Sequence, residues 1–171
     1  EVRAVSRVKP VHVHAEDSLA SAAYWVGSQA TRLTASPAAQ IGSIGVYAVV
    51  EDWSAMYAER GIKTHIIKSG KFKGAGAEGA EVTQEELDEI QRMADSINDL
   101  FANAVAKGRS MTMSQVAKVN DGRVWLAEEA QGLGLIDGVE SFDVAMNKLR
   151  VEARPARSTK SAKAKMAVAA L

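Results

Sequence analysis

A serine at position 21 stands where a strand-like pattern changes into a helix-like pattern among very small side chains. Residues 10–15 alternate apolar and polar side chains as a strand does, and residues 19–29 then read as a helix rich in small residues. A serine on the first turn of a helix has its hydroxyl near unpaired N–H groups and the positive end of the dipole, which stabilise an oxyanion. Ser21 is therefore a candidate nucleophile; the alternative is that it caps or packs the helix.

A nucleophilic serine needs a base, and a lysine can supply one. The amine must be neutral, which requires burial or positive surroundings that lower its pKa from about 10.4. Lys73 lies in a glycine-rich loop after a strand pattern at residues 62–68 and is a candidate general base. Ser43 could orient that amine as the third member of a generalised triad. Ser43 itself lies between two glycines. This segment is either a shaped loop before a buried strand or an ordinary tight turn.

Composition limits the other chemistries. The 171 residues suffice for one domain, and Lys+Arg and Asp+Glu are equal at 21 each, so no global field favours nucleic acid or an anionic membrane. The chain has no cysteine, which excludes disulfides, thiol catalysis and thiolate metal sites. No apolar run approaches the roughly 20 residues of a membrane span.

Two features suggest a metal or a nucleotide only weakly. His12 and His14 share one face of the first predicted strand, but no third ligand with suitable spacing follows them. The glycine-rich loop at residues 69–79 lacks the Gly-Lys-Ser/Thr ending of a nucleotide-binding loop. We therefore expect neither a metal nor a cofactor.

The remaining patterns predict an α/β fold. Thr83 and Glu86 form a capping box at the start of a long amphipathic helix that ends near residue 108. Further strands and helices alternate; the strand or extended segments are 32–35, 123–125 and 134–138, and the helices are 51–60, 111–118, 126–132 and 141–149, the last capped by Ser141. This alternation implies a mainly parallel sheet flanked by helices, with right-handed crossovers. Residues 1–150 form the domain, and residues 151–171 read as a basic, mobile tail.

Four motifs in order resemble the signatures of the signal peptide peptidase A family. They are Ala20-Ser21-Ala22-Ala23-Tyr24-Trp25, Gly42-Ser43-Ile44-Gly45-Val46, Ser69-Gly70-Lys71-Phe72-Lys73, and Gly122-Arg123-Val124-Trp125 with Glu129-Ala130 and Gly134-Leu135-Ile136-Asp137. The resemblance covers roughly residues 10 to 140. It implies a Clp protease-like, crotonase-type α/β fold and a serine endopeptidase with a Ser-Lys dyad.

The resemblance also implies a role for each site residue. Ser21 attacks the scissile carbonyl, Lys73 is the base, Ser43 orients the lysine, and the Ala22 N–H is one oxyanion donor. The family usually has two glycines after its serine, where this chain has Ala22 and Ala23. Its upstream strands, and the loop that supplies a second oxyanion donor, are absent from these residues. Lys71 competes for the role of base but lies outside the Ser-Gly-x-x-Lys spacing.

The expected partners are a peptide or protein substrate and further copies of the chain, because family members form ring or dome oligomers. The biological setting would be a bacterial cell envelope or a phage procapsid. No nucleic acid is expected beyond weak contact through the basic tail, and this chain carries no membrane anchor. Its first residue, Glu1, suggests a processed product or a fragment.

Three alternatives stay open: a phage prohead or scaffold-processing peptidase of the same family, an acyl-CoA-binding crotonase relative, and a catalytically silent assembly subunit.

Overall fold

Within the residues that the structure describes, six short strands pair into two three-stranded sheets. The structure is a computed structural model and describes residues 1–153. In the first sheet, β1 (His12–Ala15), β3 (Arg32–Ala35) and β6 (Gly138–Val139) are parallel, in the order β1-β3-β6. In the second, β2 (Ser18–Ala20) is parallel to β4 (Gln40–Gly42), and β5 (Val124–Leu126) is antiparallel to β4. The predicted α/β class with parallel pairing is confirmed; the Clp protease-like fold remains a prediction.

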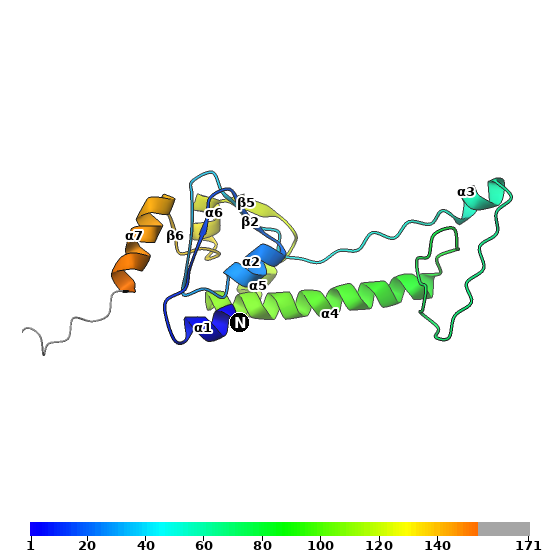
Figure 1. Ribbon diagram of the computed structural model, residues 1–171, viewed down its shortest axis with the longest axis horizontal. Coiled ribbons are helices and arrows are strands. Elements are labelled where there is room, and N and C mark those ends of the chain that lie inside the picture. Colours follow the sequence, from blue (N-terminus) through cyan, green and yellow to red (C-terminus); the bar gives the residue numbers. More distant parts are fainter. Residues whose placement is uncertain (154–171) are drawn as a thin grey trace, which may run out of the picture.

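The described residues also contain seven helices, and one of them is much longer than the others (Figure 1). They are α1 (Val2–Ser6), α2 (Ala22–Gly27), α3 (Ser54–Glu59), α4 (Gln84–Arg109), α5 (Met113–Ala117), α6 (Ala127–Gly132) and α7 (Phe142–Glu152). The capping box of Thr83 and Glu86 begins α4 as predicted. Among the described residues, no helix combines the length and the apolar character that crossing a membrane requires.

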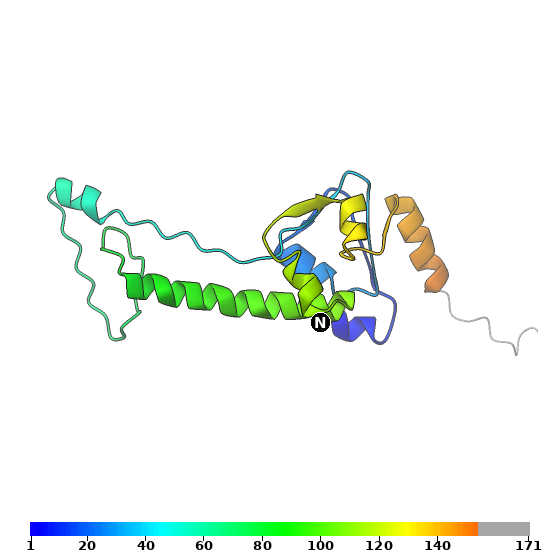
Figure 2. The same ribbon diagram turned by 180° about the vertical axis from the view of Figure 1, so that it is seen from behind.

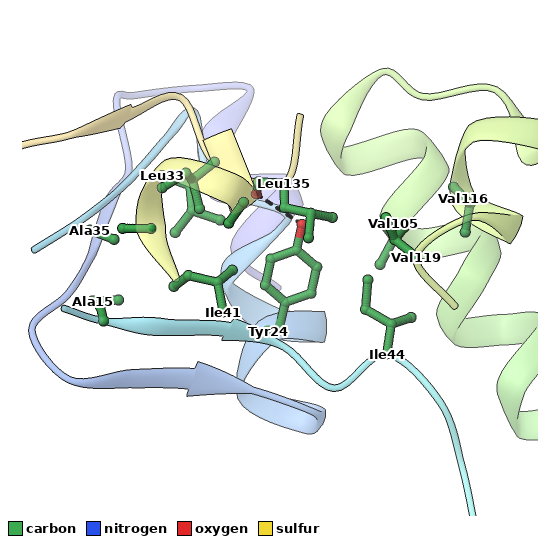
Figure 3. Packing of buried hydrophobic residues seen from close by; sticks show 14 of the residues in the cluster. Ala15, Tyr24, Leu33, Ala35, Ile41, Ile44, Val105, Val116, Val119 and Leu135 are labelled. Carbon is green, nitrogen blue, oxygen red and sulfur yellow. Dashed lines mark hydrogen bonds between the residues drawn. The ribbon is translucent and has the colours of Figure 1, made fainter. Parts of the chain in front are cut away.

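The core lies where the sheets meet α2, α4 and α6. Tyr24 is fully buried, and its hydroxyl donates a hydrogen bond to the Leu135 carbonyl at 2.9 Å (Figure 3). Leu33, Ile41 and Val105 are also fully buried in this cluster. Because Tyr24 belongs to α2, this packing fixes the helix that directly follows Ser21.

Residues 46–83 and the first half of α4 form an arm that projects from the body (Figures 1 and 2). The sequence predicts a buried strand at residues 46–50 and another strand at 62–68, but neither segment is a strand in the single chain. The prediction of burial at 46–50 is wrong for this chain, since Tyr47 is 87% exposed and Val49 is 75% exposed. A strand needs a hydrogen-bonded neighbour, and none of the described segments pairs with these residues.

Two helix boundaries and one helix cap also differ from the prediction. Leu19 belongs to β2, so the helix predicted to span residues 19–29 is only α2. Helix α7 continues through residues 151 and 152, which were predicted to begin the tail. Ser141 precedes α7 but makes no side-chain capping bond. The rest of the predicted basic tail, from residue 154, lies outside the described residues.

The carboxyl end of α4 is fixed to the body at adjacent positions. Gly108 lies so close to the end of α2 that a Cβ there would be 2.2 Å from the Ser28 carbonyl oxygen. Arg109, whose side chain is 7% exposed, forms a bidentate ion pair with Asp137. Asp137 also accepts a 2.7 Å hydrogen bond from the Leu33 N–H, which links α4 to β3. These contacts determine the direction of the whole arm.

Replacing Gly108 by alanine should therefore destabilise the protein, although alanine favours helices by about 1 kcal/mol. The methyl group would push against backbone, and we expect the free energy of unfolding to fall by about 1–3 kcal/mol. Gly132→Ala is the matched control, because nothing lies within 4 Å of a Cβ at that position. Urea unfolding of both variants measures the effect. Equal stability of Gly108→Ala and Gly132→Ala would contradict the close contact.

The Asp137 ion pair predicts a contribution to acid unfolding. Burial raises the pKa of the Asp137 carboxyl, but the hydrogen bonds from Arg109 and Leu33 outweigh it and hold the pKa below its usual value. This contribution to stability is therefore full above about pH 4–5 and is lost as pH falls through the lowered pKa. Asp137→Asn should be less stable near neutral pH and show a smaller further loss in acid.

Denaturant unfolding of this variant between pH 3 and pH 6 tests the prediction, with Asp143→Asn, at an exposed position in the first turn of α7, as the control. A pH dependence in Asp137→Asn identical to that of the wild type would rule the contribution out.

Candidate active site

Ser21 occupies a strained elbow between β2 and α2. Its backbone has φ 52° and ψ −129°, the conformation of the first central residue of a type II′ turn, which normally requires glycine. Two hydrogen bonds hold it: the Ser21 N–H donates to the Gly42 carbonyl at 2.8 Å, and the Ser21 carbonyl accepts from Trp25 at 2.9 Å. The Ser21 hydroxyl does not cap α2, and the residue is exposed. The capping alternative for Ser21 is thus excluded.

Ser43 lies beside this elbow, directly after β4. It also has a positive φ of 48°, and its N–H donates to the Arg123 carbonyl at 2.7 Å. The preceding Gly42 cannot carry a side chain, because a Cβ there would be 2.8 Å from the Trp125 ring. The Gly122 N–H donates to the Ile44 carbonyl at 2.9 Å, so two loops are hydrogen-bonded side by side. The first glycine of the predicted shaped loop therefore serves a close approach to β5.

The two serines line one polar cavity of about 400 Å³. Its other polar side chains come from the middle of α4, from the loop before β5 and from the arm, namely Asp95 and Asn98, Asn120 and Asp121, and Tyr47. Arg123 hydrogen-bonds Asp121 and holds the pKa of that carboxyl below its usual value. The lining contains carboxylates, amides and hydroxyls but, among the described residues, no amine and no imidazole.

A second, mainly apolar cavity of about 220 Å³ opens next to the first, with Ser21 in the wall of both. Trp25 and Phe101 stack face to face in its wall with ring centroids 4.7 Å apart. Val46 and Ile97 contribute further apolar surface. A side chain bound here would lie beside the Ser21 hydroxyl, so the pair of cavities can hold a reacting carbonyl between an apolar and a polar compartment.

Lys73 lies on the arm, away from these cavities. It is exposed, within the segment at residues 61–82 that forms the distal part of the arm (Figures 1 and 2). Nearby, Lys71 forms an ion pair with Glu85 in the first turn of α4. Glu85 and Asn98, which lines the serine cavity, are about 20 Å apart along the helix axis. One chain therefore brings Ser21 and Ser43 together but does not bring Lys73 to them.

The two histidines of β1 have local partners. His12 Nε2 lies 2.8 Å from Glu152. His14 hydrogen-bonds Thr34 at 2.9 Å, and its ring is tilted by 59° against the Phe142 ring of α7, with the centroids 5.9 Å apart. The described part of the chain contains no group of three or more side chains with the arrangement of a metal site. The histidine pair thus helps to attach α7 to the sheet.

Sequence reasoning missed several residues of the two cavities. Asn98 lies four residues after Ala94 and three before Phe101, and this polar residue on the apolar face of α4 was the available signal. Asn120 was interpreted only as part of an Asn-Asp-Gly turn. Trp25 and Phe101 belonged to predicted helices, but nothing in their spacing indicated that the two rings stack.

Comparison with known proteins assigns the chain to a family. The model of peptidase family S49 matches residues 3–155. The chain is 31% identical over 147 residues to a chloroplastic serine protease of Arabidopsis thaliana, 29% over 144 residues to protease 4 of Salmonella typhi, and 27% over 155 residues to a capsid assembly protease of Escherichia phage lambda.

These matches cover 85%, 82% and 90% of this chain. The chain spans only 22%, 22% and 35% of the lengths of the three relatives. The family match nevertheless includes both strained serines, both cavities and the whole arm. The chain belongs to peptidase family S49.

Proposed function

We propose that this protein is a serine endopeptidase in which Ser21 is the nucleophile and Lys73 the general base. The observation that carries the proposal is the geometry of Ser21 in a chain of a peptidase family. The backbone of Ser21 is strained, its hydroxyl does not cap α2, and the residue is exposed between two cavities. Strain at a non-glycine residue is retained where surrounding contacts enforce it, which is common at active sites. An elbow of this kind presents a hydroxyl to substrate in strand–turn–helix nucleophile sites.

We further propose that the dyad forms between two copies of the chain. Lys73 and Ser21 must lie within hydrogen-bonding distance for proton transfer, and in one chain the arm keeps them apart. The polar cavity at Ser21 holds several acceptors, including Ser43, and needs a donor. A lysine amine from the arm of a neighbouring copy has the required length and chemistry. Lys71 is the weaker candidate, because its amine is paired with Glu85.

The surface of the arm supports such an assembly. A monomer seldom exposes many large apolar side chains on one segment, because each adds surface that water solvates poorly. On the arm, at least a third of the residue is exposed at Tyr47, Val49, Trp53, Ile62, Ile67, Phe72, Leu87 and Met93. A hollow of about 760 Å³ also opens between the two sides of the arm. Packing of arms between copies would bury these side chains and supply the partners that the extended segments lack.

The chemistry follows from this arrangement. The Ser21 oxygen attacks the scissile carbonyl while the neutral Lys73 amine takes the serine proton. The amine gives this proton to the leaving nitrogen as the C–N bond breaks, and water then hydrolyses the acyl group left on Ser21 and restores the hydroxyl. The Ala22 N–H is one donor to the oxyanion, and Ser43 orients the lysine. The apolar cavity walled by Trp25 and Phe101 would bind an apolar side chain of an extended peptide.

A capsid-processing role is the second candidate. The relative from phage lambda is a capsid assembly protease and is similar over 90% of this chain. The dyad and the cavities would be the same, and the substrate would be an assembly protein. The same chemistry therefore serves both roles. A crotonase-type acyl-CoA protein or a silent assembly subunit would instead show no dependence on the two dyad residues.

Labelling with a fluorophosphonate probe should modify Ser21. The label should disappear in Ser21→Ala, and Lys73→Ala should slow labelling by about 100-fold or more, because the serine loses its general base. Lys71→Ala is the matched control and should label at close to the wild-type rate. Mass spectrometry of the labelled peptide identifies the site. Wild-type labelling in folded Lys73→Ala would remove the lysine from the mechanism.

Mixed assemblies test the shared site. Ser21→Ala and Lys73→Ala should each be inactive alone, because every site lacks one dyad member. Co-expressed in equal amounts, the two chains should regain about a quarter of the wild-type peptidase activity, since random pairing of copies restores that share of sites. The double variant Ser21→Ala/Lys73→Ala, co-expressed with wild type, controls for dilution. Absence of any regain in mixed oligomers would show that the dyad does not form between copies.

A further inference from the structure

Two amide side chains in the polar cavity have buried oxygen atoms without a hydrogen-bond partner. They are the Oδ1 atoms of Asn98 and Asn120, both inaccessible to solvent. Buried polar atoms are nearly always hydrogen-bonded in folded proteins, so such atoms in a cavity wall indicate a donor that binds there. Both residues line the cavity that contains Ser21 and Ser43.

The positions of the two amides are fixed independently. Asn120 lies in the loop that the Gly122 and Arg123 hydrogen bonds attach to the Ser43 segment. Asn98 is on α4, one turn before Phe101, whose ring stacks on Trp25 just after the nucleophile. One amide therefore approaches the serine pair from the β5 side and the other from α4.

We propose that Asn98 and Asn120 are positioning residues, whose side-chain oxygens accept hydrogen bonds from the Lys73 amine of a neighbouring copy and hold it between Ser21 and Ser43. This inference rests on the proposed dyad. An amine has more than one N–H to donate, and the cavity offers these two acceptors in addition to the serine hydroxyls.

The amides also suit a general base better than carboxylates would. A carboxylate next to the amine would stabilise its protonated form and raise its pKa, whereas an amide carries no charge. The charged groups around the cavity are Asp121, whose charge Arg123 offsets through an ion pair, and the exposed Asp95, which accepts a 2.7 Å hydrogen bond from Gln91. Tyr47 presents a phenol that is largely in solvent.

The test is the pH dependence of kcat/KM for the assembled protein with a peptide substrate. In the wild type, activity should rise as the lysine amine loses its proton, and Lys73→Ala should abolish it. Asn98→Asp and Asn120→Asp each place a negative charge beside the amine. We therefore expect the acidic limb of the pH profile of kcat/KM to move to higher pH by about one unit. Asn98→Leu should lower kcat by about tenfold with KM little changed.

Asn103→Asp is the matched control, because it introduces the same charge on the exposed face of α4, five residues farther along. Its acidic limb should coincide with that of the wild type. The proposal would be overturned, with the dyad left in place, if the acidic limb of the pH profile did not move in either Asn98→Asp or Asn120→Asp. An equal shift of this limb in Asn103→Asp would overturn it as well. A change in KM alone would assign the amides to the substrate instead. If the Lys73→Ala variant were as active as the wild type, both the dyad and this inference would be rejected.

Discussion

The packing of α4 on α2 is the contact on which the rest of the structure depends. Trp25 stacks on Phe101, and about two turns farther along α4 Gly108 permits the helix to meet the Ser28 backbone. The aromatic stack forms a wall of the apolar cavity beside Ser21. The same contact sets the axis of a 26-residue helix, of which only the carboxyl-terminal part packs on the body. One packing interaction thus shapes the candidate active site and directs the arm that carries Lys73.

The two serines of the site depend on backbone strain that their neighbours enforce. A non-glycine residue at positive φ costs about 1–3 kcal/mol, which hydrogen bonds from surrounding segments must offset. Gly42 connects both positions, because its carbonyl accepts the Ser21 N–H and it directly precedes Ser43. β4 is in turn held between β2 and β5. The second sheet therefore serves mainly to hold two hydroxyl groups in a geometry that a free chain would avoid.

The sequence predicted the local structure well where periodicity and capping carry the information. The strand at Arg32–Ala35 and the capping box at Thr83 agree with the structure, because both depend on residues close together in the chain. The prediction of a buried strand at residues 46–50 was wrong, because a strand pattern alone does not show whether another segment is in place to pair with it, and none of the described segments is.

The candidate site could be predicted only in part for a related reason. Ser21 and Ser43 stand in recognisable motifs, and the structure brings them into one cavity. The unpaired amides of Asn98 and Asn120 depend on a helix and a loop that are distant in sequence. The single chain does not bring Lys73, which stands in the Ser-Gly-x-x-Lys motif, to that cavity. Spacing along the sequence does not show whether two residues meet within one copy or between two copies.

The central claim, that Ser21 of one copy meets Lys73 of another, is most directly tested by cross-linking. The chain has no native cysteine, so a short bismaleimide reacts only at cysteines that are introduced. A mixture of Ser21→Cys and Lys73→Cys chains should give a covalent dimer joined at those two positions, identified by mass spectrometry, and Lys107→Cys in place of Lys73→Cys should not. A Ser21→Cys/Lys73→Cys chain that cross-links within itself, at the mass of a monomer, would contradict the account.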